Sequence, residues 1–443
     1  MIKEFFYKIL LRITDYDYFD EYSSICNNQK QFENYQKELL QKLILHCYEN
    51  VTYYKNLFED IGLIKNKQIE LEKFTQIPIL TKEKLRENFN QLKSNNADER
   101  KSFDNSTGGS TGEPVKFMHD REYEKWCNAA NRFYFKNILE IDDLHSKKVV
   151  LWGSDKDLFK GTIGYKAKIL NYLTNTVLLN SFKMTDQNME KYVRIINSYK
   201  PKILRGYAGS LYELSLFIKR TKSETFSPLV IISEAENLTD EMKKTIEGAF
   251  DAKVYNNYGS REIGPTAGEC KKGNFHVFDF HNFIEIVDKE GKPSSDGRIV
   301  VTNLHNYSMP FIRYEIGDTG ILNNKKCSCH LKLPIIEKLT GRIVSTFLLK
   351  NGTTVPSEFF IHLIGVVSKD LPIKKFQVIQ ESFEKIKIMV VLKKTLPTVA
   401  KHKTEQQIRQ VMGKNCQIEW QIVNDIPKTS SGKYIYTKSL INK

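Results

Sequence analysis

KVVLWG, at residues 148–153, is a short apolar run flanked by segments whose apolar residues have helical spacing. Runs of the same kind recur further along, in alternation with helical patterns. They are TVLLN (176–180), KILRGY (202–207), PLVIISE (228–234) and KVYNNYG (253–259). Because strands that alternate with helices usually pair in parallel, the sequence predicts an α/β fold built on a mainly parallel sheet.

The segment after this alternation has a different pattern. In the region from 275 to 320, the runs FIEIVDKEGKP, GRIVVTNL and FIRYEIGDTGIL alternate apolar and polar residues and are joined by turn residues. This pattern predicts a smaller antiparallel β region. After Gly341 come short strand patterns and one helical pattern at 401–413. We therefore predict two domains, 1–340 and 341–443, of which the second is a small α+β domain.

The N-terminal third predicts further helices. Residues 30–50 have the spacing of a long amphipathic helix, and Thr81 is expected to cap another.

Composition limits the classes of function. The 443 residues carry a net charge of +14, but the lysines are spread along the chain and no basic run is interleaved with aromatics. We therefore expect no nucleic-acid partner, although the charge suits polyanionic small molecules.

No apolar run reaches the ~18 residues of a membrane span, so no transmembrane segment is expected. The seven scattered cysteines, with no secretory signal before them, predict a cytoplasmic protein. The sequence allows a homodimer but does not establish the oligomeric state.

STGGSTGEP, at residues 106–114, combines three glycines with four hydroxyl residues. Glycines let main-chain N–H groups converge on an anion, and the hydroxyls add donors. The stretch matches neither a Walker A loop nor a dinucleotide fingerprint. We interpret it as a phosphate cradle, and the alternative is an ordinary flexible loop.

Three later stretches also carry residues suited to nucleotide chemistry. NNYGSRE (256–262) follows a strand pattern, where ligands bind in open α/β sheets, and its carboxylate can hold Mg²⁺. RYEIGD (313–318) offers an aspartate that suits a ribose diol. KTSSGK (428–433) places a lysine that can neutralise charge on a phosphate. The alternative for NNYGSRE is a polar turn after a strand, and KTSSGK in isolation would be a solvated basic tail.

In this order the four stretches resemble the adenylate-forming superfamily, which includes acyl-CoA ligases and peptide-synthetase adenylation domains. The closer resemblance is to its phenylacetate-CoA ligase-like branch, including capsule-polysaccharide-associated members, and it covers nearly the whole chain. Further segments that look like this branch are HCYENVTYYKNLF (46–58), IPILTK (77–82), SEAE (233–236), Gly341-Arg342 and Pro356-Ser357-Glu358.

The resemblance implies an acid–thiol ligase. Such enzymes form an acyl-adenylate from ATP and a carboxylic acid, release pyrophosphate, and transfer the acyl group to a thiol, usually that of coenzyme A. Their small C-terminal domain is mobile and rotates between the two half-reactions. ATP, Mg²⁺ and CoA are therefore the implied cofactors. An amine acceptor, in surface-polysaccharide or secondary-metabolite biosynthesis, is the alternative. Glu262, Asp318 and Lys433 argue against a non-catalytic relative.

Motif by motif, the resemblance also implies roles for single residues. The β- and γ-phosphates of ATP would be gripped by Ser106, Thr107, Gly108, Gly109, Ser110, Thr111 and Gly112. The adenosine would be bound by Glu234, Ala235, Asn257, Tyr258 and Gly259, with Asp318 on the ribose hydroxyls and Arg342 at the hinge near the ribose. The catalytic residues would be Glu262 on Mg²⁺, Lys433 between phosphate and carboxylate, and Arg261.

The sequence departs from the family pattern in three places. Arg261 stands where Ser or Thr is usual, and it either contacts the α-phosphate or pairs with a carboxylate. Val344 and Ser345 replace the acidic hinge residues, which favours the amine alternative. Phe360 replaces a residue that is commonly acidic. The first half-reaction is therefore better supported than the second.

Four residues in two segments predict a metal site. Cys270 and His276, together with Cys327 and Cys329, offer the ligands of a tetrahedral structural zinc, with His330 as a substitute. Some members of the resembling branch carry a similar set. The alternative is four ordinary loop residues.

The acid-binding pocket is predicted from position alone. Trp152, Tyr207 and Gly209 lie at the ends of strand patterns and are candidates to contact the acid. An aromatic residue on a buried strand is, however, more often part of the core.

Overall fold

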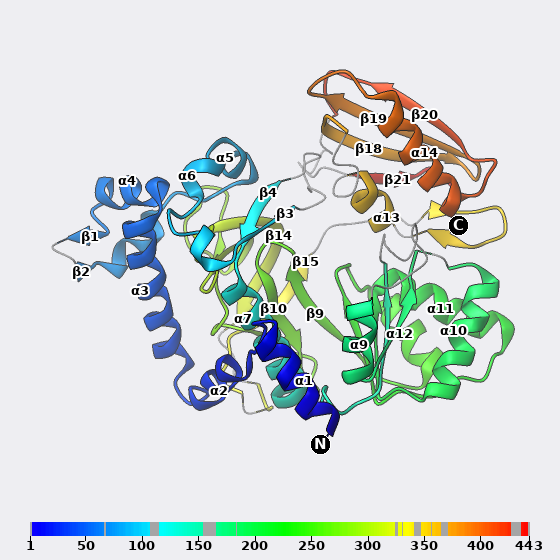
Figure 1. Ribbon diagram of the computed structural model, residues 1–443, viewed down its shortest axis with the longest axis horizontal. Coiled ribbons are helices and arrows are strands. Elements are labelled where there is room, and N and C mark those ends of the chain that lie inside the picture. Colours follow the sequence, from blue (N-terminus) through cyan, green and yellow to red (C-terminus); the bar gives the residue numbers. More distant parts are fainter. Residues whose placement is uncertain are drawn as a thin grey trace. The chain divides into compact units, whose positions relative to one another are not determined.

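The computed structural model describes residues 2–65, 68–106, 115–153, 165–182, 184–323, 327–329, 331–340, 347–355, 357–364, 371–426 and 436–441. The chain forms two compact units (Figure 1). The first comprises residues 1–105, 116–143 and 257–341, and the second comprises 106–115, 144–256 and 342–443. Among the described residues, no helix is both long and apolar enough to cross a membrane.

Helices dominate the N-terminal part of the first unit. They are α1 (Ile2–Ile13), α2 (Phe19–Asn27), α3 (Phe32–Asn50), α4 (Thr52–Asp60), η1 (Leu71–Gln76), α5 (Lys82–Glu87), α6 (Phe89–Leu92), η2 (Asp98–Arg100), α7 (Arg121–Phe133) and η3 (Tyr134–Ile138). The long helix α3 confirms the prediction for residues 30–50. Thr81 caps α5 as expected, because its Oγ accepts a hydrogen bond from the Lys84 N–H at 3.3 Å.

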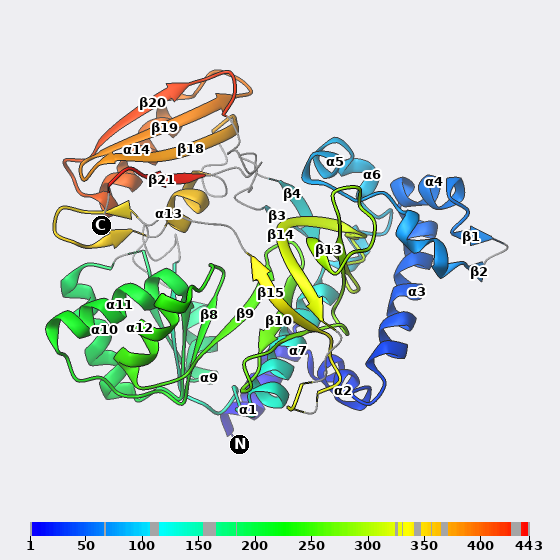
Figure 2. The ribbon, with the colours of Figure 1, turned by 180° about the vertical axis from the view of Figure 1, so that it is seen from behind.

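An antiparallel sheet forms the rest of the first unit (Figure 2). Its strands, in spatial order, are β12 (Asn282–Val287), β13 (Asp296–Asn303), β14 (Tyr314–Asn323), β15 (Ile335–Thr340), β11 (Phe275–Val277), β10 (Gly264–Glu269) and β9 (Val254–Ser260). The predicted antiparallel region is confirmed by β12, β13 and β14, and the sheet extends beyond them. The remaining strands form two pairs, β1 (Ile64–Lys65) with β2 (Gln68–Ile69) and β3 (Phe103–Ser106) with β4 (Lys116–His119).

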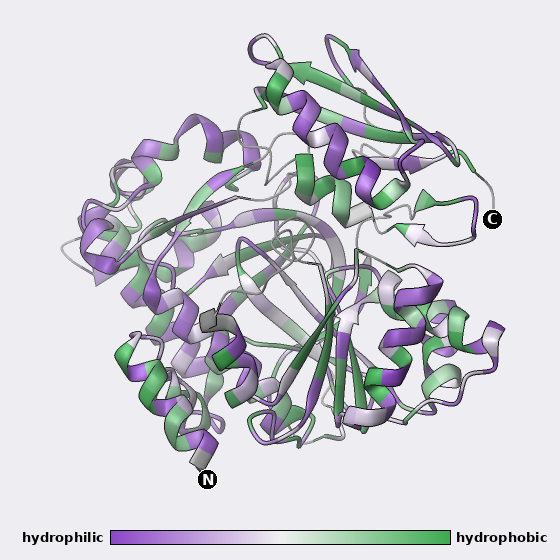
Figure 3. Cartoon of the chain, turned by 45° about the vertical axis from the view of Figure 1, so that its right-hand side comes forward, coloured by the Kyte–Doolittle hydropathy of each residue, from purple (hydrophilic) through white to green (hydrophobic). Residues whose placement is uncertain are grey.

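The second unit contains the predicted parallel strands. In spatial order they are β6 (Thr176–Asn180), β5 (Lys148–Trp152), β7 (Ile203–Tyr207) and β8 (Val230–Glu234). The helices of this part are α9 (Tyr165–Leu173), α10 (Asp186–Tyr199), α11 (Ala208–Thr221) and α12 (Asp240–Phe250). Apolar strand residues and the inner faces of α10, α11 and α12 share one core, and Figure 3 shows the hydrophobic residues along the strands. The predicted α/β class is therefore confirmed.

The C-terminal part of the second unit is an α+β layer, as predicted. Its elements are β16 (Phe347–Leu348), β17 (Thr354–Val355), α13 (Ser357–His362), β18 (Ile373–Ser382), β19 (Lys385–Leu392), α14 (Thr398–Met412), β20 (Gln417–Ile422) and β21 (Thr437–Ser439). The sheet order is β20-β19-β18-β21, and Ile408 and Met412 of α14 pack in its apolar core. Phe360 is fully buried in the same core, which explains why an acidic residue is absent there.

Asp279, between β11 and β12, gives the fold a pH-dependent stability. Its side chain is buried, its Oδ1 has no hydrogen-bond partner among the described residues, and burial raises its pKa to about 8. Because the folded pKa lies above the unfolded value of 3.8, the unfolded chain loses this proton first as pH rises. The free energy of unfolding should therefore fall by on the order of 1 kcal/mol per pH unit between these values.

Asp279→Asn keeps the shape of the side chain without a titrating proton. We expect this variant to be more stable than the wild type, with a larger gain at pH 8 than at pH 5. Urea unfolding at the two pH values measures the gain, and an equal gain at both would contradict the assignment.

Candidate active site

In the second unit, three predicted residues gather at the carboxyl ends of parallel strands. Trp152 ends β5, Tyr207 ends β7 and Glu234 ends β8, and these strands are neighbours in the sheet. The ring centroids of Trp152 and Tyr207 are 4.3 Å apart. Ligands of open α/β sheets bind at this edge, so the geometry makes it a candidate binding surface.

An arginine that the sequence analysis did not single out organises this edge. The Nε of Arg205 donates to Oε2 of Glu234 at 2.6 Å, and Glu234 is only 6% exposed, so the ion pair holds the carboxylate in place. Ala235 then turns the chain with a left-handed φ of 65°. The next carboxylate, of Glu236, accepts the main-chain N–H of Gly209. The structure thus brings Glu234, Ala235 and Gly209 to one place.

In the first unit, β9 and β14 hold the second group of predicted residues. The Oη of Tyr258 donates to Oδ2 of Asp318 at 2.9 Å. The Oη of Tyr314 donates to Oε1 of Glu262 at 3.3 Å, and the Nζ of Lys82 lies 3.8 Å from the same oxygen. Lys82 and Glu262 are 4% and 5% exposed, so water screens this ion pair weakly. Two motifs that are distant in sequence are therefore in direct contact.

Three further predicted residues belong to the 256–262 motif, and they range from buried to exposed. Asn257 is buried and pairs with Gly268 across β9 and β10. A Cβ on Gly259 would lie 2.5 Å from the main-chain oxygen of Gly264, so the close approach of the two strands requires glycine here. Arg261 follows β9 and has an exposed side chain.

Part of the predicted site lies outside the described residues. These positions are Thr107, Gly108, Gly109, Ser110, Thr111, Gly112, His330, Arg342, Val344, Ser345 and Lys433. Ser106 is described and ends β3, and β4 begins at Lys116, so these strands flank the predicted phosphate loop. The roles of all these residues stay predictions.

The four predicted metal ligands lie together in the first unit. Cys270 and His276 come from the β10–β11 hairpin, whereas Cys327 and Cys329 lie between β14 and β15. Their ligand atoms all lie within 4.8 Å of one another. The sulfurs of Cys270 and Cys327 are 3.8 Å apart, and the Sγ of Cys329 is 3.1 Å from Nε2 of His276.

The surroundings of this cluster favour ionised sulfur at one ligand. Burial opposes ionisation of Cys327, but hydrogen bonds from the Cys329 N–H and from Nδ2 of Asn274 lower its pKa. Burial raises the pKa of Cys329 to about 12. Three thiols and one imidazole are the donor set of a structural zinc centre, which has no open coordination position.

A pocket of about 320 Å³ opens beside Arg261 in the first unit. Its walls come from β3, β4, α7 and the β9–β10 connection, and they include Asn105, His119, Tyr123 and Ser260. Apart from Arg261, the sequence analysis assigned no role to these residues, because none stands in a recognisable spacing.

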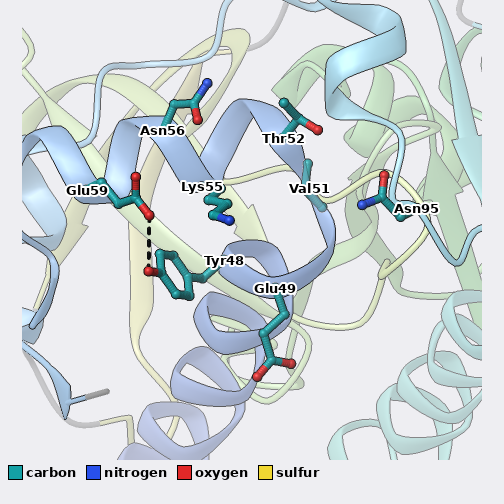
Figure 4. Close-up of a pocket in the computed structure, with 8 residues that line it drawn as sticks. All are labelled: Tyr48, Glu49, Val51, Thr52, Lys55, Asn56, Glu59 and Asn95. Atoms are coloured by element: carbon teal, nitrogen blue, oxygen red, sulfur yellow. Dashed lines mark hydrogen bonds between the residues drawn. The ribbon is translucent and has the colours of Figure 1, made fainter. Parts of the chain in front are cut away.

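A larger pocket, of about 470 Å³, lies where α3 meets α4 (Figure 4). On its wall the Oη of Tyr48 donates to Oε1 of Glu59 at 3.1 Å, and Lys55 and Asn56 of α4 are exposed. The sequence analysis assigned no role to any single residue that lines it, although most of them lie in the segment 46–58 that resembles the branch. Its larger volume alone does not connect it to the predicted chemistry.

Known proteins match this chain along most of its length. Residues 347–440 match the family model described as the CapK C-terminal domain. The chain is 24% identical to Protein CapK of Staphylococcus aureus over 437 residues, which cover 94% of this chain and 91% of that protein. It is 25% identical to the phenylacetate-coenzyme A ligase of Thermus thermophilus over 354 residues, 75% of each chain.

Solved structures share the fold. A 2-hydroxyisobutyryl-CoA ligase in complex with 2-HIB-AMP and CoA superposes with a TM-score of 0.59 at 18% identity, covering 94% of this chain and 90% of that one. An open conformation of a ligase of the same name gives 0.56 at 17% identity, covering 90% of each. The chain is therefore similar to CapK and to phenylacetate-coenzyme A ligases, which matches the predicted resemblance to the phenylacetate-CoA ligase-like branch of the adenylate-forming superfamily.

Proposed function

We propose that this protein is an AMP-forming ligase that activates a carboxylic acid with ATP and transfers the acyl group to coenzyme A. In the first step a carboxylate oxygen attacks the α-phosphorus, and pyrophosphate leaves. In the second step the thiol sulfur attacks the carbonyl carbon of the acyl-adenylate, AMP leaves, and the thiol proton passes to solvent. The full-length likeness to CapK and the likeness to phenylacetate-coenzyme A ligases support this reaction class.

The observation that carries the proposal is the contact between the motifs on β9 and β14. Asp318 accepts from Tyr258 through one carboxylate oxygen, and a carboxylate has further acceptor sites for the two ribose hydroxyls. Glu262, held by Tyr314 and Lys82, is the residue that would hold Mg²⁺. Bound there, the ion would neutralise phosphate charge. Tyr258 would lie against the adenine.

The remaining predicted residues are given the roles that their sequence motifs imply. Residues 106–112 would bind the outer phosphates, and Glu234 with Ala235 would line the adenine. Lys433 would neutralise charge between phosphate and carboxylate, since attack at phosphorus needs positioning and charge neutralisation more than proton transfer. Arg261 would either contact the α-phosphate or pair with a carboxylate.

The C-terminal part is proposed to move in the reaction. We propose that residues 341–443 form a separate domain that rotates between the half-reactions, with Arg342 at its hinge. The CapK C-terminal domain match, at 347–440, falls within these limits.

We also propose that the cluster of Cys270, His276, Cys327 and Cys329 holds a structural Zn²⁺, on the basis of its donor set.

A cytoplasmic location is proposed because all seven cysteines are free of disulfides.

ATP–pyrophosphate exchange with a panel of carboxylic acids tests the function. Exchange that depends on one class of acid is expected, followed by AMP release when CoA is added. AMP release with amines and not with CoA would assign the alternative acceptor. Absence of both exchange and ATP binding would overturn the proposal.

Asp318→Asn is expected to raise the KM for ATP in this exchange by about 10-fold or more, which corresponds to about 1.5 kcal/mol for a charged hydrogen bond. The amide oxygen still accepts from Tyr258, so the fold is retained, but the ribose loses a charged acceptor. Asp296→Asn, at an exposed position on β13, is the matched control. An unchanged KM in Asp318→Asn would contradict the ribose role.

A further inference from the structure

We infer that helix α1 binds the protein to an anionic lipid bilayer, with the helix lying in the plane of the membrane surface. None of the residues of α1 has a role in the proposed ligase reaction. The membrane contact would therefore determine where the reaction takes place and would not change its chemistry.

α1 presents apolar side chains on two opposite faces. Tyr7 and Leu11 are buried on one face. The other face carries large apolar side chains whose exposed fractions range from 36% to 78%: Phe5, Phe6, Ile9 and Ile13. At 3.6 residues per turn these four lie within an arc of about 100°, which we call the outer stripe. Figure 3 shows hydrophobic residues along this helix, which starts beside the N-terminal label. A surface helix usually turns polar residues outward, so the outer stripe indicates a binding surface.

Basic residues border the outer stripe on both sides. Lys8 and Arg12 follow one border along the helix, and Lys3 lies at the other. The side chain of Arg12 is 77% exposed. The one acidic residue in the sequence of α1 is Glu4, which lies on the side of the buried face and pairs with the Nζ of Lys8 at 2.9 Å. Long basic side chains at such borders can reach lipid phosphates while their methylene groups lie along the apolar stripe.

Two carboxylates that follow α1 are balanced by cations. Asp17 accepts from the Nε of Arg12 at 3.0 Å. Asp15 is bridged by Lys101 at 2.7 Å and by Lys125 at 3.1 Å. Three cations therefore surround these two carboxylates, and the whole chain carries a net charge of +14. An anionic surface is thus attracted to the protein as a whole and meets a locally compensated region at the end of α1.

The dimensions of α1 favour a membrane surface over the other possible occupants. With 12 residues the helix is about 18 Å long, so it is too short to cross a hydrocarbon core of about 30 Å. A stable dimer needs about 800 Å² of each partner. The four side chains of the outer stripe, on average about half exposed, offer roughly 400 Å², which is too little for pairing with a second copy through this helix alone. A bilayer accepts a short apolar stripe because it requires no matching shape.

Sedimentation of the full chain with lipid vesicles tests the membrane contact. Vesicles of equal parts phosphatidylcholine and phosphatidylglycerol are compared with vesicles of phosphatidylcholine alone. The wild type should bind the anionic vesicles about 10-fold more tightly. Phe5→Ser/Phe6→Ser should weaken this binding by about 30-fold, because two large apolar side chains no longer enter the bilayer. Arg12→Gln should weaken binding to the anionic vesicles by about 5-fold and leave binding to phosphatidylcholine unchanged.

A matched variant controls for the loss of exposed apolar surface as such. Leu229→Ser/Ile422→Ser removes two side chains of the second unit that are 62% and 65% exposed, and it should bind vesicles like the wild type. Because Phe5 and Phe6 are exposed, Phe5→Ser/Phe6→Ser should keep the wild-type Tm. Its rate of ATP–pyrophosphate exchange should also stay unchanged, so the membrane contact and the ligase reaction are tested separately.

Phe5→Trp gives a second measurement that keeps the stripe apolar. Its added fluorescence should shift to shorter wavelength with anionic vesicles, and brominated lipids should quench it. Wild-type protein that stays in the supernatant with anionic vesicles, or binding that survives in Phe5→Ser/Phe6→Ser, would overturn the membrane contact. A wild-type dimer in ultracentrifugation that becomes monomeric in Phe5→Ser/Phe6→Ser would assign the outer stripe to a second copy and would also overturn it.

Discussion

Glu262→Gln is expected to slow acid-dependent ATP–pyrophosphate exchange by about 10²–10³-fold, by analogy with the loss of one preorganised hydrogen-bond donor from an active site. Glutamine has nearly the same shape, so its amide oxygen can still accept the hydrogen bond of Tyr314. What is lost is the negative charge that would bind Mg²⁺. Steady-state exchange at saturating acid, with Mg²⁺ as the varied component, measures both the rate and the metal dependence.

The stability of this variant has to be measured beside its activity. Lys82 is buried 3.8 Å from the Glu262 carboxylate, and removing one partner of a buried ion pair leaves the other charge unpaired. The assays are therefore run well below the Tm of the variant. Glu213→Gln, at another buried glutamate, controls for the loss of a buried carboxylate as such. Full activity in Glu262→Gln, with an unchanged Mg²⁺ dependence, would contradict the assignment.

The second large effect is expected at the Cys270–His276–Cys327–Cys329 cluster. Purified protein should contain about one Zn²⁺ per chain by elemental analysis, and Cys327→Ser should contain almost none. A structural zinc contributes on the order of 10 kcal/mol of apparent binding energy. Loss of even a third of this would lower Tm by roughly 10 °C in a unit of this size.

A matched variant separates the metal from the loss of a buried thiol. Cys416 is also buried, but it belongs to the second unit, and Cys416→Ser should keep its zinc. Dialysis of the wild type against a chelator should reproduce the Tm of Cys327→Ser. Stoichiometric zinc in Cys327→Ser, or a wild-type Tm that the chelator leaves unchanged, would rule out the structural metal.

The parallel strands could be predicted from the sequence because each contains a short apolar run between helical patterns. β5, β6, β7 and β8 lie within a residue or two of the expected segments. β10 was not expected, since GPTAGE has neither an apolar run nor clear alternation, and β11 lies at the start of the region predicted to be antiparallel but was not expected as a separate strand. Their strand conformation comes from pairing with β9 and β15, which is a long-range interaction.

The site could be predicted only where residue type and motif coincide. Tyr258 and Asp318 were expected near one nucleotide, and their side chains are in contact. The supporting residues Arg205 and Lys82 were missed, since a single Arg or Lys carries no periodic signal. Only the folded chain places Arg205 against Glu234 or Lys82 against Glu262. Such residues can be identified from contacts and burial, and not from spacing.

Isotope transfer from the acid to AMP tests the central claim most directly. The acid that gives the most exchange is prepared with ¹⁸O in its carboxylate and incubated with ATP, Mg²⁺ and CoA. An acyl-adenylate leaves the bridging oxygen on phosphorus when the thiol attacks the carbonyl carbon. Mass spectrometry should therefore find one ¹⁸O atom in the released AMP. Unlabelled AMP, or turnover that releases ADP and phosphate, would contradict the proposed adenylation.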